Sequence, residues 1–476
     1  MTSPSDSPDT TSARCPGVTL QEILDTDQKE VPEALRIVSA ADLGTADIAA
    51  DRYTSQAFHD LEMQHMWARA WQMACRLEDL TDPGDSIVYD IGDYSLVVVR
   101  GRDGVIRGFH NSCLHRGRQL VTQPSRLTQL RCPFHGFAWD LAGKLRTVPC
   151  RWDFPQIRDE EWALPQVRVD SWGGFVFVCL SPDTPPLAVY LAEVPDHFKT
   201  WPLEQRYKIA HVGKVLPTNW KTAQEAFMES FHVLATHPQT VAVTGDANTQ
   251  YDTFPGRPHY SRMVTAQVVP SPHLSGDVTD AQVLETYLRN RKVSPLGVSL
   301  VTNVRDLNVD EYAVASDGRQ ARAVVADALR DQLSEKSGVD LHYISDSEAV
   351  DAIEYHIFPN LLPWAGFGSP TVYRVRPNGH DPSSCFFEVM LLMPFPDGAT
   401  RPKGSPLRVL GPEESWTDAP ELGMLGHVVE QDMSNLPALQ RGLRASAKKT
   451  VTLGNYQESR IRLYHQTIDK YISGEL

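Results

Sequence analysis

The sequence is poor in cysteine, lacks long apolar runs and carries fewer positive than negative charges. Only 7 of its 476 residues are cysteine. This odd number in a chain of such length argues against a disulfide framework and favours a reducing compartment, for which we expect the cytoplasm. No apolar run approaches the roughly 18 residues of a membrane span. The formal net charge of −15 disfavours nucleic acid and anionic membranes as partners, because both would repel the chain.

The remaining composition is that of a globular protein with two or three domains. We expect residues 1–50 to form a partly disordered extension, because they begin with a polar tail and show no secretory signal. Alternating patterns at 85–110 and the apolar stretch "WGGFVFVCL" predict a small all-β domain, which we place with its preceding helix at 51–188. Mixed helix and strand patterns predict an α+β domain at 189–476. Within it, 240–345 is expected to contain long loops.

Two short segments of the predicted β domain each carry one cysteine and one histidine. Cys113 and His115 lie in "NSCLHRGRQL", and Cys132 and His135 lie in "RCPFHGFAWD". Two thiolates and two imidazoles can bind Zn²⁺, or a [2Fe–2S] cluster with two Cys on one iron and two His on the other. Zinc fingers usually pair Cys with Cys and His with His. One ligand of each kind per segment favours the Rieske cluster over zinc, and over two unrelated buried cysteines.

The segments "CLHRGRQL" and "CPFHGFAWDLAGKL" resemble the Rieske domain of ring-hydroxylating oxygenases. Rieske proteins of respiratory complexes normally carry two further cysteines beside the cluster, at the positions of Arg118 and Phe134. The resemblance therefore implies an oxygenase-type cluster. It also implies a second domain with an antiparallel sheet of the helix-grip, START-like kind, which holds a mononuclear Fe(II).

A helix predicted at 219–237 is the best candidate for that second metal site. Its polar face carries Glu225, Glu229 and His232, opposite an apolar stripe made by Trp220, Ala223, Phe227, Phe231 and Leu234. On its own, this face is typical of an amphipathic helix in contact with solvent. His237 follows, and two His with a distant carboxylate form the facial triad of non-haem iron oxygenases. A regular helix would rotate His237 about 140° from His232, so we predict that the helix widens or breaks there, for instance at a π-bulge.

The stretch "NWKTAQEAFMESFHVLATH" is similar to the catalytic helix of Rieske oxygenase α subunits. This resemblance implies that His232, His237 and a carboxylate far downstream bind the iron. The segment "EQDMSNLPALQRGL" makes Asp432 the expected ligand, with Glu430 and Asp418 as competitors.

The resemblance also implies a catalytic role for Glu229 and a set of partners. Family members form head-to-tail trimers, in which Glu229 would link His232 to the partner subunit's His135. Ring dioxygenases usually have Asp at the position of Glu229 and Asn at the position of Ala226. In having Glu at position 229, this sequence resembles the choline and carnitine monooxygenases. O₂ would be the co-substrate. NAD(P)H would act through a separate reductase, with or without a ferredoxin, because no G-x-G-x-x-G motif follows a strand. A β subunit is a further option.

Apolar side chains near the predicted iron favour a hydrophobic substrate. Phe227, Met228 and Val233 are expected to form pocket walls, together with parts of 240–345 and "YHIFPNLLPWAGFG". We expect mono- or dihydroxylation of a hydrophobic, preferably aromatic compound. If this substrate carries a carboxylate, Arg262 or Arg305 could bind it. The alternatives are a monooxygenase or demethylase of a non-aromatic or N-/O-methyl substrate, a Rieske electron carrier without a second iron, and a zinc-stabilised binding protein.

Overall fold

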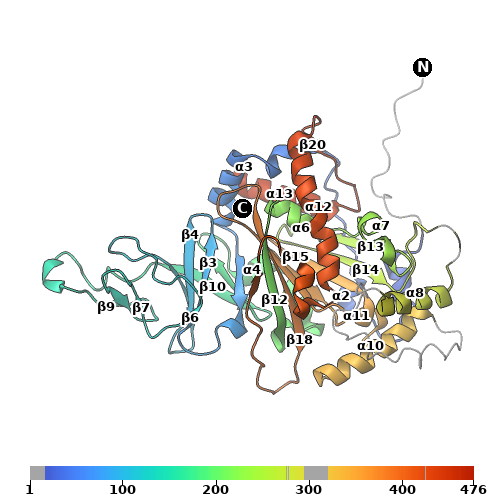
Figure 1. The fold of residues 1–476 in the computed structure, drawn as a ribbon, viewed down its shortest axis with the longest axis horizontal. Helices are drawn as coiled ribbons and strands as arrows, with labels where there is room; N and C mark the ends of the chain where they lie inside the picture. The colour runs from blue at the N-terminus through green and yellow to red at the C-terminus, as the bar shows by residue number, and fades with distance from the viewer. Residues whose placement is uncertain (1–16, 275, 277, 294–319, 424) are drawn as a thin grey trace.

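The structure is a computed structural model that describes residues 17–274, 276, 278–293, 320–423 and 425–476. An elongated β-rich arm projects from a larger body of helices and sheet (Figure 1). The tail at 1–16 and Arg305, both named in the predictions above, lie outside the described residues. None of the described helices combines the length and the apolar character that a bilayer crossing requires.

The arm consists of two antiparallel sheets. The larger has the strand order β2-β11-β10-β5-β4-β3-β6, and a small one, β7-β8-β9, lies toward the end of the arm (Figure 1). The strands are β2 Gln72–Arg76, β3 Asp85–Ile91, β4 Tyr94–Arg100, β5 Ile106–His110, β6 Ser125–Arg126, β7 Leu130–Arg131, β8 Ala138–Trp139, β9 Leu145–Thr147, β10 Gln166–Trp172 and β11 Phe175–Cys179. The predicted all-β domain is confirmed, because the alternating segments at 85–110 form β3, β4 and β5.

The body is built on an eight-stranded sheet of order β13-β14-β15-β16-β17-β18-β12-β19. All neighbours pair antiparallel except β12 and β19. The strands are β12 Arg206–Leu216, β13 Thr244–Thr253, β14 Tyr260–Gln267, β15 Ala352–Ile357, β16 Leu361–Ala365, β17 Thr371–Pro377, β18 Cys385–Pro394 and β19 Arg408–Leu410. A two-stranded pair joins β1 Ile48–Ala49 to β20 Thr450–Val451. The predicted α+β class with an antiparallel sheet is confirmed.

Helices surround this sheet, and α6, α12 and α13 lie close together beside it (Figure 1). The α-helices are α1 Leu20–Leu24, α2 Glu33–Arg36, α3 Gln56–Leu61, α4 Leu187–Leu191, α5 Val194–His197, α6 Trp220–Glu225, α7 Val233–Thr236, α8 Asp280–Val293, α10 Ala321–Ser337, α11 Asp346–Val350, α12 Leu425–Ala445 and α13 Ser459–Ser473. A π-helical segment, η3 Glu62–Trp67, follows α3. The 3₁₀ turns are η2 Ala50–Tyr53, η4 Leu77–Asp79, η5 Arg151–Asp153, η6 Phe198–Thr200, η7 Leu203–Gln205, η8 Pro238–Thr240, η10 Trp416–Asp418 and η11 Pro420–Leu422.

The expectation of long loops at 240–345 is wrong for the described part of that range. It contains β13, β14, α8 and α10. The strand β13 escaped detection because its polar residues, among them Asp246, Gln250 and Asp252, are buried like its apolar ones. A strand buried on both faces shows no alternation of polar and apolar residues, and alternation is the pattern that identifies a half-buried strand.

Buried polar side chains of the body fix the root of the arm. The side-chain oxygen of Asn360 accepts a hydrogen bond from the Met73 amide at 3.0 Å, and its amide donates to the Met73 carbonyl at 3.2 Å. The guanidinium of Arg374 donates to the Ala74 carbonyl and forms a bidentate pair with Glu388, at 2.6 and 2.5 Å. These bonds use the peptide groups of the edge strand β2, so the orientation of the arm is held by the same sheet that forms the site described next.

Candidate cluster loops and metal centre

The two Cys-His loops of the arm have the same backbone geometry. The amide of Cys113 donates to the carbonyl of Arg118 at 2.9 Å, and that of Cys132 donates to the carbonyl of Phe137 at 2.8 Å. In each loop a glycine four residues after the cysteine donates back to the cysteine carbonyl. Both glycines have positive φ, +73° and +83°, a conformation that other residues adopt only with strain. The loops are therefore equivalent supports for one cysteine and one histidine each.

The structure brings the four predicted cluster residues together. The rings of His115 and His135 lie 4.8 Å apart between their centroids. Cys113 and Cys132 are buried, and burial together with the neighbouring Cys132 thiol raises the pKa of Cys113. Phe137 stacks on His115 with a centroid distance of 4.7 Å and limits the freedom of that ring. Two sulfur donors and two nitrogen donors, one of each on either loop, fit a [2Fe–2S] cluster with Cys on one iron and His on the other.

The helix predicted at 219–237 is broken, but not between His232 and His237, where we predicted the irregularity: the break lies before His232, and the helix α7 connects the two histidines. The helix α6 ends at Glu225, and α7 begins only at Val233. The amide of Ser230 donates to the Tyr251 hydroxyl at 3.0 Å instead of to a helical carbonyl. The amide of His232 donates to the Glu229 carboxylate at 3.0 Å. Because side chains capture these two amides, the chain can turn between the helices without burying unpaired backbone groups.

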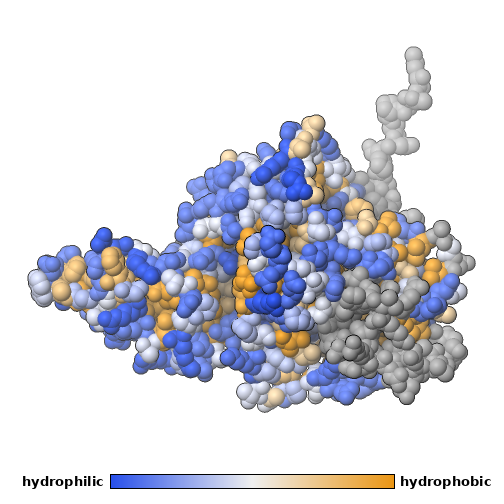
Figure 2. Space-filling model, in the orientation of Figure 1, coloured by the Kyte–Doolittle hydropathy of each residue, from blue (hydrophilic) through white to orange (hydrophobic). Residues whose placement is uncertain are grey.

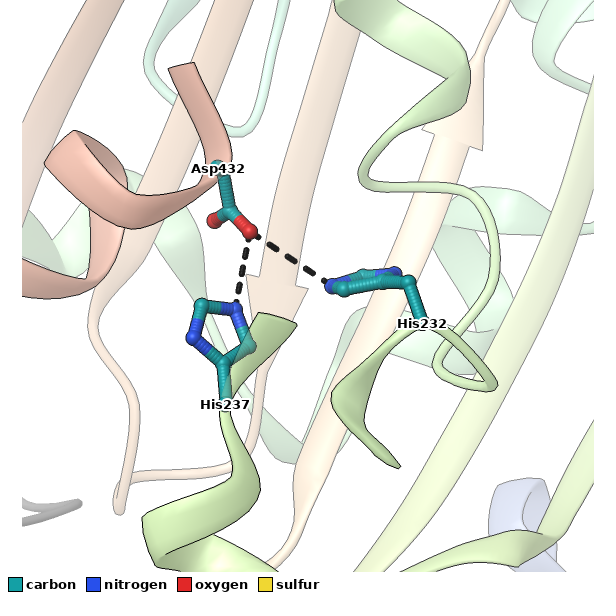
Figure 3. Close-up of side chains that lie close together, drawn as sticks. All are labelled: His232, His237 and Asp432. Atoms are coloured by element: carbon teal, nitrogen blue, oxygen red, sulfur yellow. Dashed lines mark hydrogen bonds and ion pairs between the residues drawn. The ribbon is translucent and has the colours of Figure 1, made fainter. Parts of the chain in front are cut away.

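After this turn His232 and His237 face Asp432 of α12, as Figure 3 shows. The Asp432 Oδ1 atom lies 2.8 Å from Nε2 of His237 and 3.6 Å from Nε2 of His232. One potential ligand atom from each of the three side chains lies within 4.8 Å of the others. Two imidazole nitrogens and one carboxylate oxygen fit the donor set of a non-haem Fe(II) centre with open positions.

A hydrogen-bond acceptor holds the other ring nitrogen of each histidine. The Glu229 Oε1 atom lies 2.7 Å from Nδ1 of His232, and the Gln431 Oε1 atom lies 2.8 Å from Nδ1 of His237. With a proton on each Nδ1, each Nε2 atom has a free lone pair directed at the space beside Asp432. Hydrogen bonds to the nitrogen that does not bind the metal orient metal-binding histidines in this way. Burial lowers the pKa of His232, but Glu229 and Asp432 outweigh this effect and raise it to about 9. Metal binding must therefore displace a proton.

The two other candidate carboxylates, Glu430 and Asp418, accept hydrogen bonds elsewhere. Glu430 accepts hydrogen bonds from the Ser415 hydroxyl at 2.7 Å and the Trp416 amide at 2.8 Å. Asp418 accepts from the Ser415 amide at 2.8 Å. Both are thus committed to the turn that precedes α12, whereas Asp432 faces the histidines.

The apolar stripe expected on the helix at 219–237 is only partly correct. Trp220, Ala223 and Phe227 are buried, but Phe231 is 47% exposed and Leu234 is 43% exposed. The break after Glu225 rotates the later residues away from the direction that a continuous helix would give them. Exposed apolar side chains at this place are candidates for contact with another surface.

A cavity of about 170 Å³ opens beside the three facing side chains. Phe227, Val233, Trp364 and Tyr373 give it an apolar and aromatic wall. Met228, also expected in the wall, is buried but does not line the cavity. The lining is more polar than predicted, because it also contains Ser230, Thr240, Thr244, Thr265, Gln267 and Ser369.

Sequence reasoning missed three residues that matter at this site. Gln431 holds His237, Tyr251 helps to break the helix, and Glu354 lies in the floor of the cavity. Of these, only Gln431 had a local signal, because it precedes Asp432 in the sequence. Arg262, proposed for a substrate carboxylate, is instead buried in a salt bridge with Asp252 and does not line the cavity.

Comparison with known proteins matches two regions of the chain to the domains of one family. Residues 196–474 match the model of the ring hydroxylating alpha subunit (catalytic domain), and residues 70–158 match the Rieske [2Fe-2S] domain. The chain belongs to the Rieske non-haem iron oxygenases and has the architecture of their alpha subunits. The cofactors of that family are the Rieske cluster and the mononuclear iron of the catalytic domain.

Curated relatives fall into two groups. The chain is 30% identical to biphenyl 2,3-dioxygenase subunit alpha of Rhodococcus jostii (strain RHA1) over 186 residues, which is 38% of this chain and 40% of that protein. It is 26% identical to a glycine betaine monooxygenase oxygenase subunit of Pseudomonas aeruginosa (strain UCBPP-PA14) over 190 residues, 39% of this chain and 44% of that protein. The matches thus span less than half the length of these relatives.

Solved structures show the same fold over almost the whole chain. A quaternary ammonium Rieske monooxygenase described for carnitine oxidation superposes with a TM-score of 0.60 at 15% identity, over 93% of this chain and 99% of that one. A naphthalene 1,2-dioxygenase mutant bound to phenanthrene gives 0.59 at 17% identity, over 91% of this chain and 94% of that one. At such identities the likeness establishes the fold alone.

Proposed function

We propose that this chain is the terminal oxygenase component of a Rieske oxygenase system, using O₂ and electrons from NAD(P)H delivered by a separate reductase to hydroxylate a small, mainly apolar substrate. The observation that carries this proposal is the combination, in one chain, of equivalent Cys-His loops with a His-His-Asp group that borders a cavity. When bound, the [2Fe–2S] cluster supplies single electrons and Fe(II) supplies the site at which O₂ reacts.

The residues of the chain divide this work between two proposed domains, 51–188 and 189–476. Cys113, His115, Cys132 and His135 hold the cluster in the arm. His232, His237 and Asp432 hold the iron in the body. Glu229 and Gln431 keep the two iron-binding rings in the tautomer that presents Nε2 to the metal, which they do by accepting a hydrogen bond from each Nδ1.

We also propose that the active assembly is a homotrimer in which Glu229 links two subunits. The first cluster loop follows β5, and the second connects β7 to β8, toward the projecting end of the arm. The helices α6 and α12 lie in the body (Figure 1). Phe134 in the loop and Trp152 nearby are exposed, at 58% and 81%. Glu229 lines a second cavity, of about 300 Å³, on the α12 side. This supports contact with the partner subunit's His135.

Apolar surface near both candidate contact regions supports the same assembly. Most of the surface drawn in Figure 2 is hydrophilic, with apolar side chains scattered over it. Close to Glu229, the side chains of Phe231, Leu234 and Leu439 are exposed although they are apolar. Exposed apolar residues at both ends of a proposed contact are what a head-to-tail assembly requires.

The proposed substrate is a hydrophobic compound, with an aromatic one preferred because aromatic rings line the cavity. A second candidate is a monooxygenase or demethylase of an N- or O-methyl substrate. It is supported by the glycine betaine and carnitine monooxygenases among the relatives. It is also supported by Glu229, because a glutamate at this position resembles the choline and carnitine monooxygenases. The many hydroxyl groups in the cavity favour it further, since a polar substrate would find partners there.

Metal analysis of the purified chain tests the core of the proposal. An oxygenase should contain three iron atoms per chain, with the visible and EPR spectra of a Rieske cluster, whereas an electron carrier should contain two. The His232→Ala variant should lose one iron and keep the cluster spectrum. Turnover of a panel of aromatic and N-methyl compounds with a surrogate reductase, followed by mass analysis of products, then decides between the two substrate classes. A colourless protein would refute the proposal.

A further inference from the structure

One carboxylate oxygen that faces the cavity has no hydrogen-bond partner within the described part of the chain. Glu354 lies in β15, is fully buried and lines the cavity beside the iron-binding group. Its Oε1 atom accepts a hydrogen bond from Nη2 of Arg460 at 3.0 Å. Its Oε2 atom has no hydrogen-bond partner among the described residues. A buried acceptor of this kind is costly to leave unpaired, so the position calls for a donor from outside the chain.

The surroundings of Glu354 form an aromatic wall on one face of the sheet. Met263 and Trp364 are its partners on the neighbouring strands β14 and β16, and both line the same cavity. The ring of Trp364 lies 6.1 Å from that of Tyr373, which lies 4.3 Å from that of Phe227. The indole nitrogen of Trp364 likewise has no partner within the described part of the chain. A flat apolar body therefore fits beside the unpaired carboxylate oxygen.

The charge pattern favours a donor over an acceptor as the ligand of this oxygen. Burial raises the pKa of Glu354 to about 7, even though Arg460 opposes the shift, so both of its oxygens are acceptors only above that pH, where the donor is needed. Each guanidinium nitrogen of Arg460 has an acceptor within the protein, because Arg460 also donates to the Ser261 hydroxyl and the Met228 carbonyl, each at 3.1 Å. Lysine and arginine are absent from the described cavity lining, so a substrate carboxylate would meet no cation there.

We infer that Glu354 is a specificity-determining residue that selects substrates in which a one- or two-ring apolar body carries an N–H or O–H donor. This inference rests on the proposed function, and it narrows the substrate class of the same site. The size of the cavity agrees with it, because about 170 Å³ is slightly more than the roughly 150 Å³ in which an engineered apolar cavity binds benzene. The donor pairs with Oε2, and the ring packs against the wall formed by Phe227, Trp364 and Tyr373.

Indole and indene are suitable probes, since they have the same shape and differ by an N–H in place of a CH₂. The experiment measures their dissociation constants for the iron-loaded protein by equilibrium dialysis, without reductase and therefore without turnover. The wild type should bind indole at least about tenfold more tightly, the ratio expected for a hydrogen bond to a charged group. Indene is the more hydrophobic of the two, so hydrophobicity alone predicts the opposite order.

The Glu354→Gln variant tests the residue itself. Its amide oxygen can still accept from Arg460, but its NH₂ group would replace the acceptor that faces the cavity. The preference for indole should disappear while indene affinity stays unchanged. Ser369→Ala, which removes a different polar group from the lining, should retain the preference. Iron content and the thermal unfolding midpoint show that each variant is folded.

Two results would overturn the inference: equal affinity of the wild type for both probes, including no binding of either, or an indole preference that survives in Glu354→Gln. A failure of the proposed function is distinguishable from both. A chain that lacks the second iron, or never turns over with a reductase, refutes the oxygenase activity whatever the probe ratio is.

Discussion

The contact between Gln431 and His237 should determine how tightly the second iron is held. His237 Nδ1 is 2.8 Å from Gln431 Oε1, and the same oxygen accepts from Nε2 of Gln239 at 3.0 Å. The Gln431→Leu substitution keeps the approximate volume of the side chain but removes this acceptor. The ring of His237 would then be free to rotate or to move its proton to Nε2, the atom that faces Asp432. Either change competes with metal binding.

The magnitude follows from this loss of orientation. Removing the hydrogen-bond acceptor that orients a metal-bound histidine typically costs 10- to 100-fold in metal affinity, which corresponds to about 1.4–2.7 kcal/mol. The assay dialyses the iron-loaded protein against a graded series of a chelator and measures iron per chain. The absorbance of the Rieske cluster serves as an internal reference, because the cluster lies in the arm and is unaffected by Gln431. The variant should lose its second iron at a chelator concentration 10- to 100-fold lower than the wild type.

A matched variant separates orientation from packing. Gln431→Glu retains an acceptor oxygen at the same distance from His237 and should hold iron at least as tightly as the wild type. Equal chelator resistance of Gln431→Leu and the wild type would show that His237 needs no fixed tautomer. Equal weakening in both variants would show that the amide acts through packing, and would refute the reasoning in the same way.

Three further predictions concern turnover and stability. Glu229→Gln should keep both metals, measured as iron content, and lose multiple turnover. Full activity of this variant would exclude the proposed link through Glu229 between two subunits. Burial lowers the pKa of His259 and His356 from 6.5 to about 3, so both stay neutral in the fold. Each contribution is complete well above pH 6.5 and is lost as the pH falls, by about 1.4 kcal/mol at pH 5.5. The decrease in unfolding free energy between pH 7.5 and 5.5, measured in urea, should therefore be about 1.4 kcal/mol smaller in His356→Asn than in the wild type; an equal decrease would contradict this. Lys221→Met should destabilise the protein by about 3–5 kcal/mol in urea unfolding, because the buried Glu62, 2.6 Å from the amine, then loses its cationic partner and keeps only the Trp220 indole as a donor. Unchanged stability would contradict this, and the double variant with Glu62→Met should recover most of the loss.

What the sequence alone could predict depends on how local each signal is. Cys113 with His115, Cys132 with His135, and His232 with His237 are separated by two to five residues, so their spacing is visible in the sequence. The break in the helix was not visible in this way, because it lies before His232, where the Tyr251 hydroxyl and the Glu229 carboxylate accept from backbone amides. The carboxylate partner lies 195 residues beyond His237, where only resemblance to a family could single out Asp432.

Contacts made by the sheet were beyond reach for a different reason. Glu354 acquires its role from Arg460, which is 106 residues away, and from Trp364, its partner on the next strand. Neither contact leaves a pattern in the sequence, because strand pairing and register are set by the whole fold. A glutamate inside an apolar strand looks like an ordinary interruption until its neighbours are known.

The proposed metal ligands and the strands that line the cavity belong to different parts of the fold. In this chain the ligands lie on the segment between α6 and η8 and on α12, whereas the floor of the cavity is built by β14, β15 and β16. A substitution at Glu354 or Trp364 changes what the cavity can pair with, yet it touches neither His232 nor His237. Relatives that act on biphenyl and on glycine betaine are named in the same comparison. We therefore expect substrate choice in this chain to depend on β14, β15 and β16, where the Oε2 atom of Glu354 lacks a partner among the described residues.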